Sequence, residues 1–494
     1  MDSALHQRIA EVIAEFAEAV HQQASKIDPT TPGVLPDLER TLFGLLMKLG
    51  AALVQTFLEA FHRRAEFVDA CQEQANTPGR RLLGWRFTKV YDLFGGRHKV
   101  RTPYVGVDRR HKQGRRRKRG RRGKRGSGGY PVLEALGCLA NATLALLSEA
   151  ASQLAWGPSE EAALARLAAR GIWLDASTLR RMAYTLSDTA QAARTAALEA
   201  GRPPPGIEGE SLAGKRVVIC FDGGRVRTRT QRRGRRRNNG HRGYSRPWKA
   251  PRLLVIYAID TKGRKTQHDL PIYDGVLTSA EKLFALVTAY LTALQASEAT
   301  QVIFIADGAP EHWHGVAALR EALGLEPARV VEVLDWAHAV EHLTKVADAC
   351  ASWTEQERAR WLRKQRKRLK QGQLSKVLAA LGTLCRGRRS QTLRREIAFF
   401  QQHAHRMPYD VFRKAGIPIG SGAVESALRR VVNLRMKGPG IFWTPKNAQR
   451  MLYLRCVLLS GRWESVLRTV VWPGEEGKQT SEEETSPWHI RQAA

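Results

Sequence analysis

Two apolar runs in the middle of the chain each end in an aspartate. Residues 217–221 lead into Asp222, and residues 302–306 lead into Asp307. Apolar runs of this length are typical of strands that are buried on both faces of a sheet. A third acid, Glu425, comes shortly after a Gly-Ser-Gly turn, at the predicted start of a helix. Because ligands of open α/β sheets gather beyond the carboxyl ends of the strands, we expect these acids to meet there.

The pattern around these runs predicts three strands followed by alternating helices and strands. Strands are expected at residues 216–222, 252–260, 267–273, 301–307 and 329–335, and helices at 278–296 and 313–323. This is the element order of an RNase H-like domain, with Asp222 on its first strand and Asp307 on its fourth. Residues 340–405 are predicted to form a helical insertion, after which the chain returns to the domain with Glu425.

The chain before this domain is predicted to be mainly helical. Residues 1–75 and 132–190 carry apolar positions at helical spacing, and residues 85–105 alternate like a β-hairpin. The predicted fold is therefore an α/β RNase H-like domain with a helical insertion, preceded by a mainly α region.

Two helices in residues 159–190 are separated by a glycine turn. Ser159 is expected to cap the first helix, and the second presents Arg180 and Arg181. Helix, short turn and basic helix are typical of a helix-turn-helix unit that reads the DNA major groove. Many helical pairs of this form bind nothing, and we favour DNA binding only slightly.

The charge of the chain favours a nucleic acid partner. Lys and Arg outnumber Asp and Glu by 80 to 47, which gives a formal net charge of +33. A membrane surface or an acidic protein is also possible, but an excess this large and dispersed favours a polynucleotide. The basic residues are densest at 109–126 and in the loop 225–249, neither of which contains an acid. Such stretches are expected to lie along phosphates.

Cysteine usage and hydropathy point to a soluble protein. The six cysteines form no CxxC pair, which predicts reduced thiols. No cationic and apolar signal peptide opens the sequence. The longest apolar segments, near residues 42–58 and 135–147, are too short or too interrupted to span a bilayer. We therefore expect no membrane contact.

Four motifs resemble those of the DDE transposases of bacterial insertion sequences, in the Mutator-like, ISKra-type group. They are Phe-Asp-Gly-Gly at 221–224, Ala-Asp-Gly-Ala at 306–309, Asp-Trp-Ala-His at 335–338 and Ile-Gly-Ser-Gly-Ala-Val-Glu-Ser at 419–426. The last motif continues into Arg435-Met436-Lys437 and Trp443, and it is the most specific part. The similarity covers residues 85–470.

This resemblance implies that Asp222, Asp307 and Glu425 are catalytic and bind two Mg²⁺ ions, for which Mn²⁺ can substitute. In such enzymes water first cuts at the end of the element, and the freed 3′-hydroxyl then attacks target DNA. The implied partners are double-stranded DNA of both kinds and further copies of the chain, in the bacterial cytoplasm at the nucleoid.

Asp335 and His338 match the acid-x-x-His pair that such transposases carry, and we expect an accessory role. Asp335 also ends an apolar run, so it competes with Asp307 as the second metal ligand. On a helix the two side chains share one face. The alternative is a capping aspartate with a partly buried histidine, and the sequence favours neither.

The predicted DNA contacts combine the basic segments with the motif that follows Glu425. For Trp443, stacking on a flipped base competes with a place in the core, and the core is the favoured alternative. The residues are Arg115, Arg116, Arg117, Lys118, Arg119, Arg121, Arg122, Arg180, Arg181, Arg232, Arg233, Arg235, Arg236, Arg237, Arg435, Lys437 and Trp443.

Two other functions stay open at this stage: an RNase H-like nuclease without strand transfer, and a non-catalytic basic protein that binds nucleic acid. The expected division of the chain is the same for all three. It comprises a helical region 1–80, a hairpin with an Arg-rich arm 81–130, a helix-turn-helix-like region 131–200, a linker 201–214, a catalytic core 215–339, a helical insertion 340–415, the rest of the core 416–472 and an acidic disordered tail 473–494.

Overall fold

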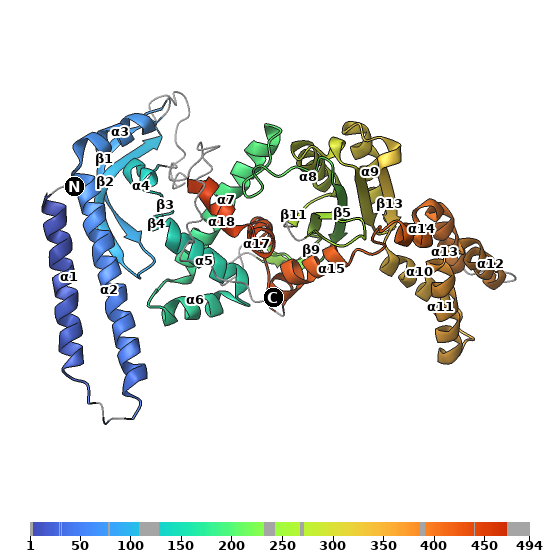
Figure 1. The fold of residues 1–494 in the computed structure, drawn as a ribbon, viewed down its shortest axis with the longest axis horizontal. Helices are drawn as coiled ribbons and strands as arrows, with labels where there is room; N and C mark the ends of the chain where they lie inside the picture. Colours follow the sequence, from blue (N-terminus) through green and yellow to red (C-terminus); the bar gives the residue numbers. More distant parts are fainter. Residues whose placement is uncertain are drawn as a thin grey trace.

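The computed structural model describes residues 3–28, 30, 32–77, 80–107, 128–231, 243–266, 271–385, 391–438 and 440–471. The predicted Arg-rich arm, the centre of the loop 225–249 and the predicted acidic tail lie outside these residues. The chain is a mixed α/β protein, mostly helical, with a five-stranded mixed sheet and N-terminal helices. Figure 1 shows the N-terminal helices at one end of an elongated molecule and the predicted helical insertion at the other.

The first three helices are α1 (Ser3–Ala24), α2 (Val34–Arg63) and α3 (Ala65–Ala75), as the sequence predicted. Figure 1 shows α1 and α2 side by side as a long hairpin that projects from the body. By length and composition α2 is long and apolar enough to cross a membrane, and only 11% of its most apolar stretch is buried inside the protein. The absence of membrane contact therefore stays a prediction.

A small sheet follows, built on the predicted hairpin. It contains β1 (Arg80–Tyr91), β2 (Arg97–Val107), β3 (Cys138–Leu139) and β4 (Ala142–Thr143), with α4 (Pro131–Ala135) beside it. Asp92 stabilises the hairpin turn, because its Oδ1 accepts 2.8 Å hydrogen bonds from the backbone N–H groups of Phe94 and Gly96. Its Oδ2 lies 2.6 Å from Nε2 of the buried His98.

Three helices connect the small sheet to the larger one: α5 (Leu144–Trp156), α6 (Glu160–Ala169) and α7 (Ala176–Glu199). The predicted cap is confirmed, since the hydroxyl of Ser159 accepts from the backbone N–H of Ala162 at 3.1 Å. Asp175 caps α7 in the same way, through the N–H groups of Ser177 and Thr178. A helix, a turn and a second helix therefore form as predicted.

The larger sheet has the strand order β11-β10-β5-β12-β13. Its strands are β5 (Arg216–Gly223), β10 (Arg252–Ile259), β11 (Ile272–Val276), β12 (Gln301–Ala306) and β13 (Val330–Leu334). Strand β10 is antiparallel to β5 and β11, whereas β12 is parallel to β5 and β13. The carboxyl ends of β5, β12 and β13 therefore lie at one edge. The side chains of β5 and β12 are mostly buried, as continuous apolar runs predict, whereas in β13 only Val333 and Leu334 are buried.

The predicted boundaries differ from the observed ones at three elements near this sheet. The third strand was expected at 267–273, but β11 begins at Ile272, and residues 267–270 lie outside the described part. Helix α9 (Pro310–Ala322) begins three residues earlier than predicted, with Pro310 in its first turn, where a missing N–H costs nothing. Helix α8 (Ala280–Ala293) lies inside its predicted range of 278–296, starting two residues later and ending three residues earlier. Single-turn helices η1 (Ala296–Glu298) and η2 (Pro327–Arg329) precede β12 and β13.

The predicted helical insertion follows β13 (Figure 1). It consists of α10 (Trp336–Asp348), α11 (Glu355–Lys370), α12 (Leu374–Cys385), α13 (Gln391–Gln402), η3 (Ala404–Arg406) and α14 (Tyr409–Lys414). The hydroxyl of Tyr409 donates to the carbonyl of Leu334 at 2.9 Å, which joins the insertion to the end of β13. Phe399 of α13 fills the space beside Gly308, where a Cβ would lie 2.1 Å from Cε2 of the ring.

The chain then returns to the sheet with five short helical segments. These are α15 (Gly422–Leu428), the π-helical turn η4 (Arg429–Asn433), α16 (Leu434–Met436), α17 (Pro445–Leu459) and α18 (Trp463–Val471). Arg455 of α17 is buried and donates a 2.7 Å hydrogen bond to the carbonyl of Val431 in η4. It also donates to the carbonyl of Ala155 in α5. One side chain thus joins three segments that are distant in the sequence.

Candidate functional site

Asp222 lies where β5 ends, on the side of the strand that faces α15. The preceding residue, Phe221, packs against Phe284 with ring centroids 5.1 Å apart. Successive side chains of a strand point to opposite faces, so Asp222 is directed away from Phe284. Its Oδ1 accepts a 2.6 Å hydrogen bond from the backbone N–H of Gly223.

The pKa of Asp222 shows that the predicted acids influence one another. Burial raises the pKa of this carboxyl, and the negative charges of Asp307 and Glu425 raise it further. The N–H of Gly223 and the positive charge of His338 act in the opposite direction. Repulsion among these carboxylates is the physical reason that a bound cation would stabilise the group.

Asp307 lies in the loop between β12 and α9, half-buried. Its Oδ1 accepts from Nδ1 of His312 at 2.6 Å and from the backbone N–H of Ala309 at 3.0 Å. Burial acts to raise the pKa of Asp307, but the hydrogen bond and charge of His312 outweigh it and lower the pKa. The indole of Trp313 donates to the backbone carbonyl of Asp307 at 2.8 Å, which fixes the loop.

His312 is a site residue that the sequence interpretation missed. Its side chain is buried in the first turn of α9, and its two nitrogens face Asp307 and Arg252. The available signal was position, because a histidine in the first turn of a helix that follows a strand-end aspartate can reach back to that carboxylate.

Asp335 lies at the end of β13 and is fully buried. Its Oδ1 accepts from the backbone N–H of Ala337 at 3.0 Å, so it caps α10. Its Oδ2 accepts from Nδ1 of His338 at 3.0 Å and from the hydroxyl of Ser421. Burial acts to raise the pKa of Asp335, but these hydrogen bonds outweigh it and lower the pKa.

His338 carries a positive charge at neutral pH in this environment. The hydrogen bond with Asp335 raises the pKa of His338 to about 9, against the effect of burial. The charges of Asp335 and Asp307 contribute to the same shift. A cation of the protein therefore lies among the carboxylates. Asp335 and His338 share one face of α10 as expected, and the capping aspartate with a partly buried histidine, which the sequence left open, is the arrangement observed.

Glu425 lies in the first turn of α15, with an exposed side chain. Its Oε1 is 3.2 Å from the hydroxyl of Ser421, which also bonds to Asp335. The backbone N–H of Trp336 donates to the carbonyl of Ile419 at 2.9 Å and holds the same turn against β13. The segment that carries Glu425 is therefore attached to the sheet edge through Asp335.

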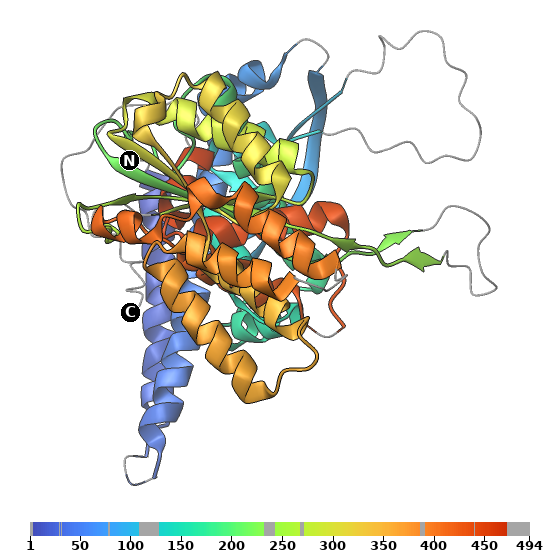
Figure 2. The ribbon, with the colours of Figure 1, turned by 90° about the vertical axis from the view of Figure 1, so that its right-hand side faces the viewer.

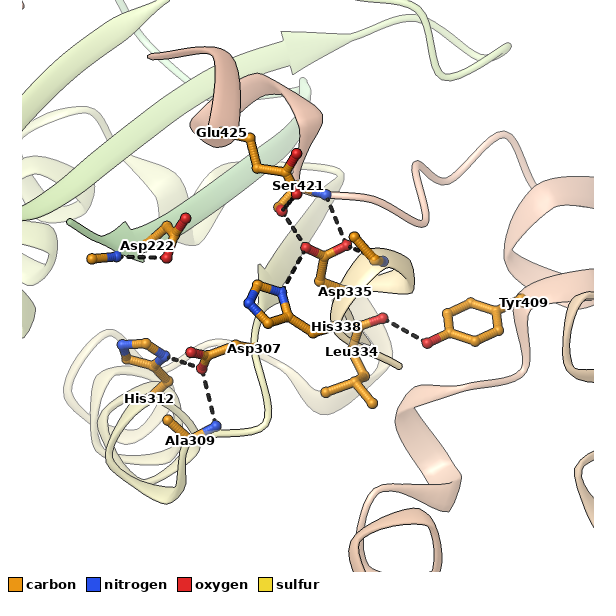
Figure 3. A network of polar contacts seen from close by, with 12 residues as sticks. Asp222, Asp307, Ala309, His312, Leu334, Asp335, His338, Tyr409, Ser421 and Glu425 are labelled. Carbon is orange, nitrogen blue, oxygen red and sulfur yellow. Dashed lines mark hydrogen bonds and ion pairs between the residues drawn. The ribbon is translucent and has the colours of Figure 1, made fainter. Parts of the chain in front are cut away.

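Figure 3 shows the result of these contacts. Asp222, Asp307 and Asp335 follow the carboxyl ends of three neighbouring parallel strands, and Glu425 approaches them from α15. His338 lies between them. The sequence predicted this set of residues, although it did not predict that Asp335 would be enclosed by protein hydrogen bonds while Asp222 and Asp307 stay partly exposed.

The carboxylates suit a hard cation by their chemistry. All their donor atoms are oxygens, which Mg²⁺ prefers. Within the ranges that the structure describes, however, no group of three His, Cys, Asp or Glu side chains is arranged to hold a metal ion. Asp222 bonds to Gly223, Asp307 to His312 and Glu425 approaches Ser421. Rotation of these side chains would be required before they share an ion.

Most of the predicted DNA contacts fall outside the described residues, namely all of those in the Arg-rich arm and in the loop after Asp222. They are Arg115, Arg116, Arg117, Lys118, Arg119, Arg121, Arg122, Arg232, Arg233, Arg235, Arg236 and Arg237. Arg180 and Arg181 are exposed near the start of α7. Arg180 lies 3.6 Å from Glu160, and Arg181 donates to the carbonyl of Ala140.

Two of the predicted contacts are buried. Arg435 lies over the ring of Trp443, with Cζ 5.3 Å from the centroid, and the indole N–H of Trp443 donates to the carbonyl of Met436 at 3.1 Å. Their exposed fractions are 4% and 7%. These side chains do not reach the surface that DNA would contact, so the core position favoured for Trp443 is the one observed. Lys437 is exposed.

Comparison of the chain with protein family models, with curated proteins and with solved structures finds no match. The resemblance to DDE transposases therefore depends on the four motifs. The structure adds an independent observation, because acids from all four motifs lie at the same edge of the larger sheet (Figure 3).

Proposed function

We propose that this chain is a DDE transposase that cuts DNA at the ends of a mobile element and joins them to target DNA. The observation that carries the proposal is the approach of Asp222, Asp307 and Glu425 at one edge of the larger sheet (Figure 3). These residues come from three motifs that are separated by most of the length of the domain.

The sheet topology supports an RNase H-like core. The strands β11, β10 and β5 are antiparallel neighbours, and the parallel strands β12 and β13 extend the sheet beyond β5. This arrangement is compatible with the element order predicted for an RNase H-like domain. In such a sheet the first and fourth strands are neighbours. The aspartates that follow them are thus adjacent, although 85 positions separate Asp222 from Asp307 in the sequence.

Asp222, Asp307 and Glu425 would hold two Mg²⁺ ions, which activate the attacking oxygen and stabilise the leaving oxygen when bound. The residues of the chain supply the rest. Asp335 keeps His338 protonated, and the imidazolium offsets part of the negative charge that would otherwise repel a phosphate. Ser421 holds the first turn of α15 close to Asp335, which positions Glu425.

DNA is the proposed substrate because the formal charge of +33 is distributed over several basic segments. The helices α6 and α7 present the exposed Arg180 and Arg181 and are the proposed duplex-reading unit. Binding through phosphates should weaken steeply as salt concentration rises, and a flat salt response would argue against this part of the proposal.

The test supplies a pre-cleaved DNA end, a second DNA and Mg²⁺, and measures joined products. We expect strand transfer by the wild-type protein and none by Asp222→Ala, with unchanged DNA binding. The matched control is Asp260→Ala, since Asp260 also follows a strand, β10, but lies at the opposite edge of the sheet. This control should retain activity.

Each outcome of this test separates the candidates. Cleavage without joining would favour a nuclease with the same fold. DNA binding without any Mg²⁺-dependent chemistry, unaffected by Asp222→Ala, would favour the non-catalytic protein.

A further inference from the structure

A β-ribbon continues β5 and β10 beyond the sheet, directly after Asp222. Its four short strands are β6 (Val226–Arg227), β7 (Thr230–Gln231), β8 (Tyr244–Ser245) and β9 (Trp248–Lys249). They pair as β6 with β9 and β7 with β8. Figure 2 shows this ribbon projecting away from the body of the molecule. The sequence predicted a basic loop with the aromatic residues Tyr244 and Trp248 here, and no strands, because strands of two residues carry no detectable periodicity.

The base of the ribbon is fixed by a segment that follows Glu425. The backbone N–H of Arg229 donates to the carbonyl of Trp443 at 2.7 Å, and the N–H of Trp443 donates to the carbonyl of Arg227 at 3.0 Å. Between them Thr228 is completely buried and donates to the carbonyl of Pro247. The ribbon is therefore attached to both chain segments that carry Asp222 and Glu425.

Arginines and aromatic rings alternate across the ribbon. The guanidinium of Arg229 lies over the ring of Tyr244, with Cζ 3.8 Å from its centroid. Arg227 lies over Trp248 at 5.1 Å, and Arg246 lies over Phe442, from the fixing segment, at 5.3 Å. Such pairs hold the rings in place and leave the opposite ring face free.

The exposure and charge of these side chains indicate what the ribbon binds. Trp248 is 50% exposed and Tyr244 is 37% exposed, although burying them would stabilise the fold. No acid occurs between Asp222 and Asp260, so the sequence of the ribbon offers no carboxylate to neutralise its arginines. Phosphate binding requires the arginines but not exposed rings, whereas stacking on bases requires both.

We propose that this ribbon binds unpaired bases of a DNA strand next to the carboxylates, with Trp248 and Tyr244 as the stacking surfaces. The duplex hides base faces, so only bases released from pairing can use these rings. The inference rests on the proposed function and deepens it, because it adds a contact to unpaired bases beside the carboxylates that would cut the strand. Arg227 and Arg229 would contact the phosphates of the same strand.

The test measures fluorescence anisotropy of two DNA duplexes in EDTA, one blunt and one with a short single-stranded tail. We expect Trp248→Ala with Tyr244→Ala to weaken binding of the tailed duplex about 10-fold and to leave binding of the blunt duplex within about 2-fold. Trp248→Phe should retain most of the affinity for the tail, because a ring remains.

The matched control is Trp156→Ala. Trp156 is 48% exposed at the end of α5, outside the ribbon and outside the proposed duplex-reading unit, so its loss tests whether any exposed tryptophan has the same effect. It should leave the preference for the tail unchanged. If the ribbon variants bind both duplexes equally more weakly, the ribbon contacts phosphates and not unpaired bases. If the variants bind both duplexes as tightly as the wild type, the ribbon does not bind DNA. Both results overturn the proposal.

The experiment separates this inference from the proposed function. Binding in EDTA requires no chemistry, so Asp222→Ala should show the same preference for the tail as the wild type. A preference for the tail without strand transfer in any assay would leave the ribbon site in place and reject the transposase. Strand transfer without a preference for the tail would support the transposase and reject the ribbon site.

Discussion

The loops after β12 and β13 begin in the same way and differ in what surrounds their acids. Each strand is an apolar run that ends in an aspartate, and the two strands pair in parallel register. Asp307 is half-buried and uses one oxygen, Oδ1, for both of its side-chain hydrogen bonds. Asp335 is fully buried and uses both oxygens for four protein donors. Position at a strand end therefore does not by itself decide whether an acid acts on a ligand or stabilises the fold.

The largest expected effect concerns activity at the first of these loops. Asp307→Asn keeps an oxygen that can accept from His312 and Ala309 but removes the negative charge. We expect strand transfer to fall at least about 1000-fold, equivalent to about 4 kcal/mol of transition-state stabilisation, with little change in thermal stability. Single-turnover joining assays and a thermal melt provide the two readouts. Retained activity would show that Asp335 is the second ligand instead.

The same substitution at the second loop should act on stability. Asp335→Asn places an amide nitrogen where Oδ2 accepts from His338 and Ser421, and it leaves the imidazolium without its buried partner. We expect the free energy of unfolding to fall by about 3 kcal/mol, measured by chemical denaturation. A variant as stable as Asp307→Asn would contradict the distinction between the two loops.

The pH dependence of stability follows from the raised pKa of His338. The folded protein binds this proton up to about pH 9, whereas the unfolded chain releases it near the ordinary value of 6.5. The contribution is therefore complete below pH 6.5 and is lost as the pH rises through 9. We expect a loss of about 3 kcal/mol over this range, and His338→Gln should not show it. An unchanged slope in the variant would assign the loss to other groups.

The smallest effect is expected at Ser421, which connects the second loop to Glu425. Ser421→Ala removes one buried donor to Asp335 and the contact with Glu425. A loss of about 1 kcal/mol in unfolding free energy is expected, with a larger loss of joining activity than of DNA binding. Ser426→Ala, on the exposed side of the same helix, is the control and should change neither quantity.

The sequence predicted the parts of this molecule that depend on local pattern. Strands β5 and β12 were found because burial on both faces leaves a continuous apolar run, and the acids at their ends stand out against it. Strand β13 was found from a shorter apolar pattern that includes the half-buried Glu332. The hairpin at residues 85–105 and the cap at Ser159 have equally local signals.

The parts that were missed depend on contacts between distant residues. Strand β11 contains Asp274, which is buried because Arg194 of α7 donates to both of its oxygens at 2.8 and 2.6 Å. A charged residue in a strand argues against burial until its partner is known. The ribbon after Asp222 likewise depends on Trp443, and the burial of Arg435 depends on the same ring. None of these pairings has a signature in the local sequence.

The helical insertion between β13 and α15 has a consequence for the order of events during protein synthesis. The basic segments and the strands that carry Asp222 and Asp307 leave the ribosome before the insertion, whereas Glu425 emerges after it. A growing chain can therefore attract nucleic acid well before its sheet edge is complete. Under the proposed function, affinity for DNA precedes the ability to break it, and an interrupted translation product would bind without cutting.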